Sequence, residues 1–372
     1  MGKFFGIIDG ENLVIQDIFS DEGDKLWVSY EGEIYNYDEI RLSLEALGYR
    51  FNSDAYSGLI AKAYKAWGED FAKRLNGAFS ICIIDKEKEI LYLIRDQVGR
   101  KPLYFSDVNG RFAFSSDVKS LLEIPRFPRE IDLRALNFYL TYRYIPQELS
   151  IFNHIRKLPA GCALRLNLRS RKIKKWSYWE PPTVEERLAN ENELLRGHFS
   201  EPEMYGTSTM NSNSGTLNGK MAFLTFKSDP DDILFKIDKI CRNLSLNVRT
   251  PFLDTRLVEF ALRNVPGNMK IRGSMTKYIL KRLATKFLPP ELPLDRKRGF
   301  NPPVSKWLRN EWWNYARDFL MEGDENFFNK GYIAWLFKRH KSILFEEGRR
   351  LFCLLNFKVW EKGDFTGDGL RK

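Results

Sequence analysis

The sequence predicts an α+β protein with a strand-rich first domain, an irregular linker and a mainly helical last domain. In the first 125 residues, short runs of β-branched and aromatic residues alternate with segments of helical periodicity. Residues 206–220 are dominated by Gly, Ser, Thr and Asn, which is typical of a flexible loop. Helical, aromatic-rich sequence follows from residue 232 onward. We therefore expect domains over 1–180 and 232–372, joined by a linker over 181–231.

Strand composition marks four stretches of the first domain, at residues 4–9, 26–35, 78–95 and 103–115. The third stretch is long enough for two strands with a turn between them at 85–88. The fourth is predicted to be a hairpin closed by Asn109 and Gly110, the residue pair that a type I′ turn favours. These antiparallel elements predict a sheet-based domain rather than a helical one.

Helical periodicity marks the segments 38–47 and 54–67 of the first domain. Asp38 and Asp54 are predicted to cap their N-termini, and a glycine directly after each segment is predicted to end it. A further helix is expected over 132–144. Tryptophans recur in the last domain, and we expect most of them to pack in its core: Trp307, Trp312, Trp313, Trp335 and Trp360.

Composition excludes several classes of protein. The net charge is 59 − 49 = +10, and 43% of the residues are hydrophobic, enough for sizeable cores. No stretch approaches the ~18 consecutive apolar residues of a membrane helix, and an early acid, Asp9, interrupts any secretory segment. The four cysteines are too widely spaced for a CxxC pair, and the three histidines lack ligand spacing. We therefore expect a cytoplasmic protein without a metal site.

Residues 156–175 are strongly basic and contain no acid. Leu164 and Leu166 alternate with polar residues, which predicts a strand with its charges on the outer face. Two interpretations stay open: a solvated hairpin, which we favour, and a surface for nucleic acid or another polyanion. No aromatic ladder or known binding motif accompanies the charge.

Several short strings stand out along the chain: Gly-Glu-Ile-Tyr-Asn-Tyr at 32–37, Arg-Leu-Asn-Gly-Ala-Phe at 74–79, Arg-Asp through Lys-Pro-Leu-Tyr at 95–104, Lys-Leu-Pro-Ala-Gly at 157–161, Arg-Thr-Pro-Phe-Leu-Asp at 249–254 and Arg-Lys-Arg-Gly-Phe at 296–300. In their order, and over nearly the whole chain except about 180–230, they resemble the asparagine synthetase family. Members of this family take ammonia from glutamine and use ATP to amidate aspartate. The resemblance implies an Ntn-hydrolase-like αββα sandwich, the class II glutamine amidotransferase fold, followed by a reduced helical remnant of the synthetase domain.

The resemblance also implies that the glutaminase site is lost. The family's nucleophilic cysteine is replaced by Gly2, which has no side chain to attack an amide. Its oxyanion-hole asparagine is replaced by Glu31, and an ionised carboxylate repels an oxyanion. No arginine lies in 10–25 to bind the glutamine carboxylate. Glu33 and Asp54 match residues that hold the glutamine α-amino group, and they are either relics, which we favour, or a weak amine site.

The synthetase site is expected to be lost as well. The family's Ser-Gly-Gly-x-Asp-Ser pyrophosphate loop is absent, and the roughly 55 residues before Lys236 cannot hold a nucleotide-binding sheet of several strands. The family's catalytic glutamate is replaced by Asn247, which cannot accept a proton as a base. Asp238, Arg249 and Asp254 are expected to form a buried ion network. Lys236 is a further matched position. The positions that by resemblance face the pyrophosphate are expected to remain as a solvated basic patch, able to hold a phosphate or an acidic partner: Lys277, Arg296, Lys297 and Arg298.

Three functions are compatible with this sequence. We favour a non-catalytic scaffold or subunit, because both sites are lost while the strings that carry the fold persist. The first alternative is an ATP-dependent amide-forming ligase that works with a complementing partner, and it alone would need ATP and Mg²⁺. The second is a polyanion or nucleic-acid binding module. Since the missing sheet would leave apolar helix faces exposed, we expect another protein or a second copy to cover them.

Overall fold

The computed structural model describes most of the chain, and the account below concerns these residues: 4–10, 12–16, 18–20, 25–146, 148–182, 221, 233–244, 246, 248–292, 302–322, 327–342 and 344–365. They belong to two compact units. The first comprises Met1–Ala135 and Ile145–Pro293, and the second comprises Leu136–Tyr144 and Leu294–Lys372. The predicted linker falls almost entirely outside the described residues, so its bounds stay a prediction.

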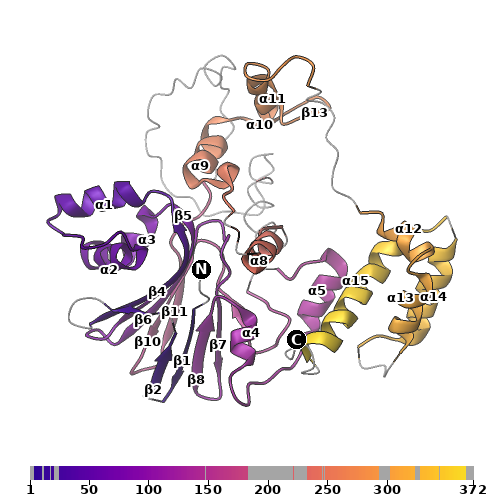
Figure 1. Ribbon diagram of the computed structural model, residues 1–372, viewed down its shortest axis with the longest axis horizontal. Coiled ribbons are helices and arrows are strands. Elements are labelled where there is room, and N and C mark those ends of the chain that lie inside the picture. Colours follow the sequence, from indigo (N-terminus) through magenta and orange to yellow (C-terminus); the bar gives the residue numbers. More distant parts are fainter. Residues whose placement is uncertain are drawn as a thin grey trace. The chain divides into compact units, whose positions relative to one another are not determined.

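Two antiparallel sheets form the first unit (Figure 1). One has the order β2(Asn12–Ile15), β1(Phe5–Asp9), β8(Arg111–Ser115), β7(Tyr104–Val108), β9(Arg156–Lys157). The other has the order β11(Ile173–Ser177), β10(Cys162–Asn167), β6(Ile90–Arg95), β5(Gly77–Asp85), β4(Leu26–Ile34), β3(Phe19–Ser20). The predicted α+β class is therefore confirmed.

The central strand β5 shows how the layers are built. Successive side chains of a strand point to opposite faces, and in β5 both faces are buried. Phe79 and Ile81 pack in a core with α1(Tyr37–Ala46), α2(Tyr56–Trp67) and α3(Phe71–Arg74), whereas Cys82 and Ile84 pack in a second core with residues of the other sheet, including Phe112. Figure 1 shows these three helices beside the larger sheet. The short helix α4(Val118–Leu122) contacts β8 of the other sheet.

The local predictions for this unit are confirmed except at the helix caps. Asn109 and Gly110 both have positive φ, 55° and 72°, as the predicted hairpin turn requires. The helix α1 begins after Asn36 rather than Asp38, because Asn36 accepts a hydrogen bond from the backbone N–H of Asn76 and donates one to the carbonyl of Arg74. The helix α2 follows Ala55, and Asp54 is instead paired with an arginine of α1.

The described residues 233–292 belong to the first unit and not to a separate helical domain. They form α8(Phe235–Asn243), the short 3₁₀ turn Pro251–Leu253, α9(Thr255–Asn264), α10(Gly267–Lys270), the strands β12(Ile271–Arg272) and β13(Met275–Thr276), and α11(Tyr278–Ala284). Asp254 caps α9, since its carboxylate accepts a hydrogen bond from the backbone N–H of Arg256. Helical periodicity correctly indicated the helices but not the unit with which they pack.

The second unit is a helical bundle. It contains α12(Val304–Arg309), α13(Trp313–Met321), α14(Lys330–Lys341), α15(Gly348–Trp360) and most of α5(Leu133–Tyr142). Leu308, Leu320, Leu336 and Leu351 form its core, and Trp307, Trp312 and Trp313 pack against that core as predicted. Trp335 does not, because it lies on the outer face of α14 and is 43% exposed. Among the described residues, no helix has the length and apolar character needed to cross a membrane.

Candidate functional site

The segment Glu31-Gly32-Glu33 on β4 forms the centre of the candidate site. Its strand pairs with β5, so that Gly32 lies opposite Phe79 and Glu33 opposite Ala78. Gly32 has φ 118°, and a Cβ there would stand 1.9 Å from the Ala78 carbonyl oxygen. Only glycine therefore fits between two acidic residues whose side chains, two positions apart, leave the strand on the same side.

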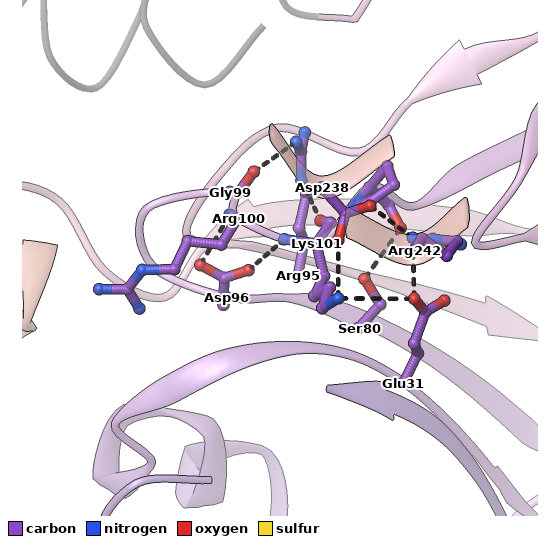
Figure 2. Close-up of polar contacts among 10 residues, drawn as sticks. Glu31, Ser80, Arg95, Asp96, Gly99, Arg100, Lys101, Asp238 and Arg242 are labelled. Carbon is purple, nitrogen blue, oxygen red and sulfur yellow. Dashed lines mark hydrogen bonds and ion pairs between the residues drawn. The ribbon is translucent and has the colours of Figure 1, made fainter. Parts of the chain in front are cut away.

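Glu31 lies in a buried network of four charged residues. Its carboxylate lies 2.8 Å from the Arg242 guanidinium and 3.7 Å from Lys101 Nζ, and its side chain is only 2% exposed. Asp238 completes the network, 2.6 Å from Arg242 and 2.7 Å from Lys101 Nζ. Figure 2 shows the four side chains pointing toward one another. Two are acids and two are bases, so their formal charges cancel.

The two sides of this network come from distant parts of the chain. Glu31 and Lys101 belong to the sheet region, whereas Asp238 and Arg242 stand four residues apart on one face of α8. Burial is the largest effect on Glu31 and raises the pKa of its carboxyl, while Arg242 and Lys101 oppose that rise. Burial lowers the pKa of Arg242, but Glu31 and Asp238 outweigh it and raise that pKa overall. The network is therefore an ionic contact that attaches α8 to the sheet.

A rigid loop presents Lys101. The Asp96 carboxylate accepts hydrogen bonds from the backbone N–H groups of Val98, Arg100 and Lys101, at 3.1, 3.1 and 3.0 Å. The Arg95 guanidinium donates to the carbonyls of Lys101 and Gly99, at 2.8 and 2.9 Å (Figure 2), and to that of Leu158 at 2.8 Å. The Arg-Asp string at 95–96 thus has a structural role, since both side chains hold the loop that carries Lys101.

A cavity of about 210 Å³ lies beside the network. Its charged lining includes Glu31, Lys101 and Arg242, and its apolar lining includes Leu234 and Ile237 of the segment that carries α8. At the matched oxyanion position this cavity therefore meets a carboxylate and no amide donor. A carboxylate accepts hydrogen bonds and repels a developing oxyanion.

A second and larger cavity, about 640 Å³, contains Glu33 and Asp54 in its lining. Glu33 accepts a hydrogen bond from Arg249 Nε at 2.9 Å, and the Arg249 side chain is 71% exposed. Asp54 forms an ion pair with Arg41, which also donates to Glu45 at 2.9 Å. The two acids matched to a substrate amino group are therefore both paired with arginines of the same chain.

The basic partners of this site were not predicted from the sequence. Arg41, Lys101 and Arg242 pair with the acids at the site, and no role was expected for them. The only sequence signal was local: Arg41 lies four residues before Glu45, and Arg242 four residues after Asp238, spacings that place both members on one helix face.

The predicted network of Asp238, Arg249 and Asp254 is wrong. Asp238 pairs with Lys101 and Arg242, and Arg249 reaches into solvent beside Glu33. Asp254 accepts a hydrogen bond from Asn76 at 2.9 Å and caps α9. The three side chains serve different contacts because residues 248–254 are followed by a new helix instead of continuing α8.

The other positions matched to the synthetase site contribute no common site among the described residues. Lys236 is exposed on α8, and Lys277 precedes α11 in a left-handed conformation with φ 57°. The remaining predicted site residues lie outside the described residues: Gly2, Asn247, Arg296, Lys297 and Arg298.

The first cysteine of the sequence and the possible metal ligands of the described residues are further candidates for site residues. Cys82, the first cysteine of the sequence, is fully buried in β5, and burial raises the pKa of its thiol well above the usual range. Within the same residues, no group of three or more His, Cys, Asp and Glu side chains could hold a metal ion.

The basic segment 156–175 contains the predicted hairpin, formed by β10 and β11. Several of its charges are paired with acids of the same unit. Arg165 lies 2.9 Å from Glu69, Arg169 3.2 Å from Glu89, and Lys175 2.9 Å from Glu148. These pairs favour the solvated hairpin over a polyanion surface.

Both parts of the chain match models of known protein families. Residues 4–179 match a family model described as a glutamine amidotransferase domain, and residues 137–362 match one described as asparagine synthase. The chain is 37% identical over 155 residues to asparagine synthetase (glutamine-hydrolyzing) 1 of Bacillus subtilis, a match that covers 42% of this chain and 24% of that protein. It is 33% identical over 181 residues to putative asparagine synthetase (glutamine-hydrolyzing) 2 of Methanocaldococcus jannaschii, covering 47% and 34%. The match thus spans about a quarter to a third of each relative's length.

A solved structure is also similar to this chain. Glutamine phosphoribosylpyrophosphate amidotransferase from Bacillus subtilis, complexed with ADP and GMP, is 13% identical, covers 52% of this chain and 46% of its own, and gives a TM-score of 0.34. A TM-score of 0.34 is too low to establish that the two chains share a fold. The family match over 4–179 and the two antiparallel sheets of the first unit agree with the predicted glutamine amidotransferase-like sandwich.

Proposed function

Because this chain belongs to the asparagine synthetase family, we propose that it is a non-catalytic member that works as a scaffold or subunit of a protein complex. We propose likewise that it needs no cofactor. ATP and Mg²⁺ would be required only if it were an amide-forming ligase.

The observation that supports this proposal most directly is the charge network at Glu31. An amidotransferase that hydrolyses glutamine must stabilise an oxyanion, and loss of one donor from an oxyanion hole typically costs about 10²–10³ in rate. Here the matched position holds a carboxylate that is already paired with Arg242, and α8 closes over it. Glu31 thus pairs with a side chain of the same protein and offers no hydrogen-bond donor to a reaction intermediate.

The second cavity supports the same proposal. An amino-acid substrate would have to displace Arg249 from Glu33 or Arg41 from Asp54 before its ammonium group could bind. Gly2 and Asn247, at the positions matched to the nucleophile and the base, supply neither function. The sequence also lacks the family's pyrophosphate loop.

A subunit role is supported by the apolar surface of residues 233–292. Phe252 and Phe287 are 69% and 78% exposed, and Ile240, Leu244 and Leu246 are exposed as well. Large contiguous apolar patches are uncommon on a monomer and are typical of interaction surfaces. We infer that a second copy of this chain or another protein covers them.

The test combines the native mass with ATP–pyrophosphate exchange. The full chain, tagged and isolated from its own cells, is expected to have the mass of a complex of fixed stoichiometry, and it should catalyse no exchange with aspartate present. A chain that is isolated as a monomer contradicts the subunit role. Exchange by the pure chain would contradict the non-catalytic role and support the ligase.

A further inference from the structure

Exposed aromatic side chains on α14 form an ordered row that the bundle core does not use. The opposite face of this helix buries Ile333, Leu336 and Phe337 in the core. Tyr332 and Trp335, at i and i+3, share the outer face, and Tyr332 is 48% exposed. The helix therefore uses one face for folding and presents aromatic groups on the other.

Contacts within the row hold it in one arrangement. The rings of Tyr332 and Trp335 stack with their centroids 5.6 Å apart and an interplanar angle of 21°. The Arg339 guanidinium lies 4.7 Å from the Trp335 centroid and 4.0 Å from that of Phe345. Arg339 Nε also donates to the buried Glu347 carboxylate at 3.0 Å. We name Tyr332, Trp335, Arg339 and Phe345 the α14 row.

This composition is that of a binding hot spot. Single exposed aromatic residues are normal on a protein surface, but Trp, Tyr and Arg together dominate the energetics of interfaces. Here they are fixed before any partner arrives, so that binding would cost little side-chain entropy. Neither Trp335 nor Tyr332 is among the buried residues of the bundle core.

The charge around the α14 row is strongly basic. Residues 330–350 contain six Lys and Arg against two Glu, a net charge of +4. Lys338 is exposed three positions after Trp335, a spacing that places the two side chains next to each other on the helix surface. The two acids are occupied inside the unit, since Glu346 pairs with Arg309 at 3.4 Å and Glu347 with Arg339. A complementary ligand is therefore acidic as well as apolar.

We propose that the α14 row binds an acidic segment of a partner protein, with apolar side chains contacting the exposed part of Trp335 and carboxylates pairing with Lys338. A single-stranded nucleic acid fits less well, because it needs aromatic faces on which bases can stack. The Trp335 ring is already engaged by Tyr332 and Arg339. This inference goes beyond the proposed function and is independent of it, because binding through α14 does not depend on whether glutamine is hydrolysed.

The test measures binding of a fluorescent random copolymer of glutamate and tyrosine to the full chain by anisotropy. Trp335→Ala is expected to weaken binding about tenfold, the usual size of a hot-spot effect, and Trp335→Phe to retain most of it. The matched control is Tyr315→Ala, which removes a ring of α13 that is even more exposed, stacks on Phe319 and should leave binding unchanged. Thermal unfolding of each variant checks that the bundle is intact.

A charge reversal gives a second and independent readout. Lys338→Glu is expected to weaken copolymer binding several-fold, whereas Lys306→Glu, the same change at an exposed position of α12, should not. Absence of copolymer binding would overturn the proposal, as would equal losses for Trp335→Ala and Tyr315→Ala. Tighter, Trp335-dependent binding of oligouridine or of phosphatidylserine vesicles would also overturn it in favour of those ligands.

Discussion

Glu31 and Glu33 stand two residues apart on β4, yet they lie in different environments. Glu31 is buried in a network of four charges, and Glu33 lies in an open cavity with one solvent-exposed partner. Both accept from an arginine of the same short segment, Arg242 for the first and Arg249 for the second. In a glutaminase the residues at these two positions would face the substrate. Here each carboxylate is paired with an arginine of the same chain, and the two arginines differ greatly in exposure, Arg242 being largely buried and Arg249 exposed.

Burial decides how much each pair contributes to stability. Removing one member of a buried pair leaves an uncompensated charge and typically costs about 3–5 kcal/mol. An exposed pair is screened by water and contributes about 0–1 kcal/mol. The network at Glu31 should therefore govern the packing of α8 on the sheet, whereas the pairs in the larger cavity should be nearly neutral.

The largest expected effect is that of Arg242→Met. It removes the cation shared by Glu31 and Asp238, and we expect a loss of about 3 kcal/mol in the free energy of unfolding, measured with guanidinium chloride on the full chain. The matched control, Arg249→Met, should change it by less than about 1 kcal/mol, because that side chain is largely exposed. Equal effects of the two variants would show that burial does not distinguish the pairs.

A buried histidine in the second unit extends the comparison to a group without an ion pair. His340 is fully buried and contacts the Ser305 carbonyl at 3.1 Å, and burial lowers its pKa. Since the unfolded chain binds the proton more readily, stability is complete above the unfolded pKa of about 6.5 and falls as the pH drops toward the folded value. Thermal unfolding between pH 8 and 5 should show this loss. A His340→Gln variant that keeps the same pH dependence would assign it to other groups.

Glu31→Gln tests the cost of the buried charge itself. Burial raises the pKa of Glu31, so its stabilising form is the protonated one, fully present below the unfolded pKa and lost as the pH rises through the folded pKa. Asp238 still pairs with Arg242 and Lys101 in this variant, so no cation is left without a partner. The neutral amide should therefore be at least as stable as the native protein at pH 7, with a difference below about 2 kcal/mol, and the difference should shrink toward pH 4. A variant that is much less stable at pH 7 would show that attraction to Arg242 outweighs burial.

The smallest effect is expected for Asp54→Asn. Its carboxylate is exposed, and its pairing with Arg41 should contribute less than about 1 kcal/mol. Chemical unfolding at low and high salt should give nearly the same stability for variant and native protein. A loss comparable to that of Arg242→Met would mean that the larger cavity, and not the Glu31 network, is the better-coupled part of the site.

The sequence allowed the first unit to be predicted well and the site only in part. Strands and the Asn109-Gly110 turn follow from local periodicity and turn chemistry, which a single sequence contains. The pairing of Glu31 with Arg242 depends on where α8 packs, and helical periodicity says nothing about that. The same limit explains why residues 233–292 were predicted to be part of a separate domain, and why Asp54 was predicted to be a cap when it pairs with Arg41.

The most direct test of the central claim is glutamine hydrolysis by the pure, full-length chain. Glutamate release should not exceed that of a heat-denatured sample at any glutamine concentration. The reason is that Glu31 occupies the oxyanion position, and that the two acids matched to the substrate amino group, Glu33 and Asp54, are paired with arginines of the chain. Release that is proportional to protein and saturates with glutamine would contradict the account, since it would require both cavities to accept the substrate.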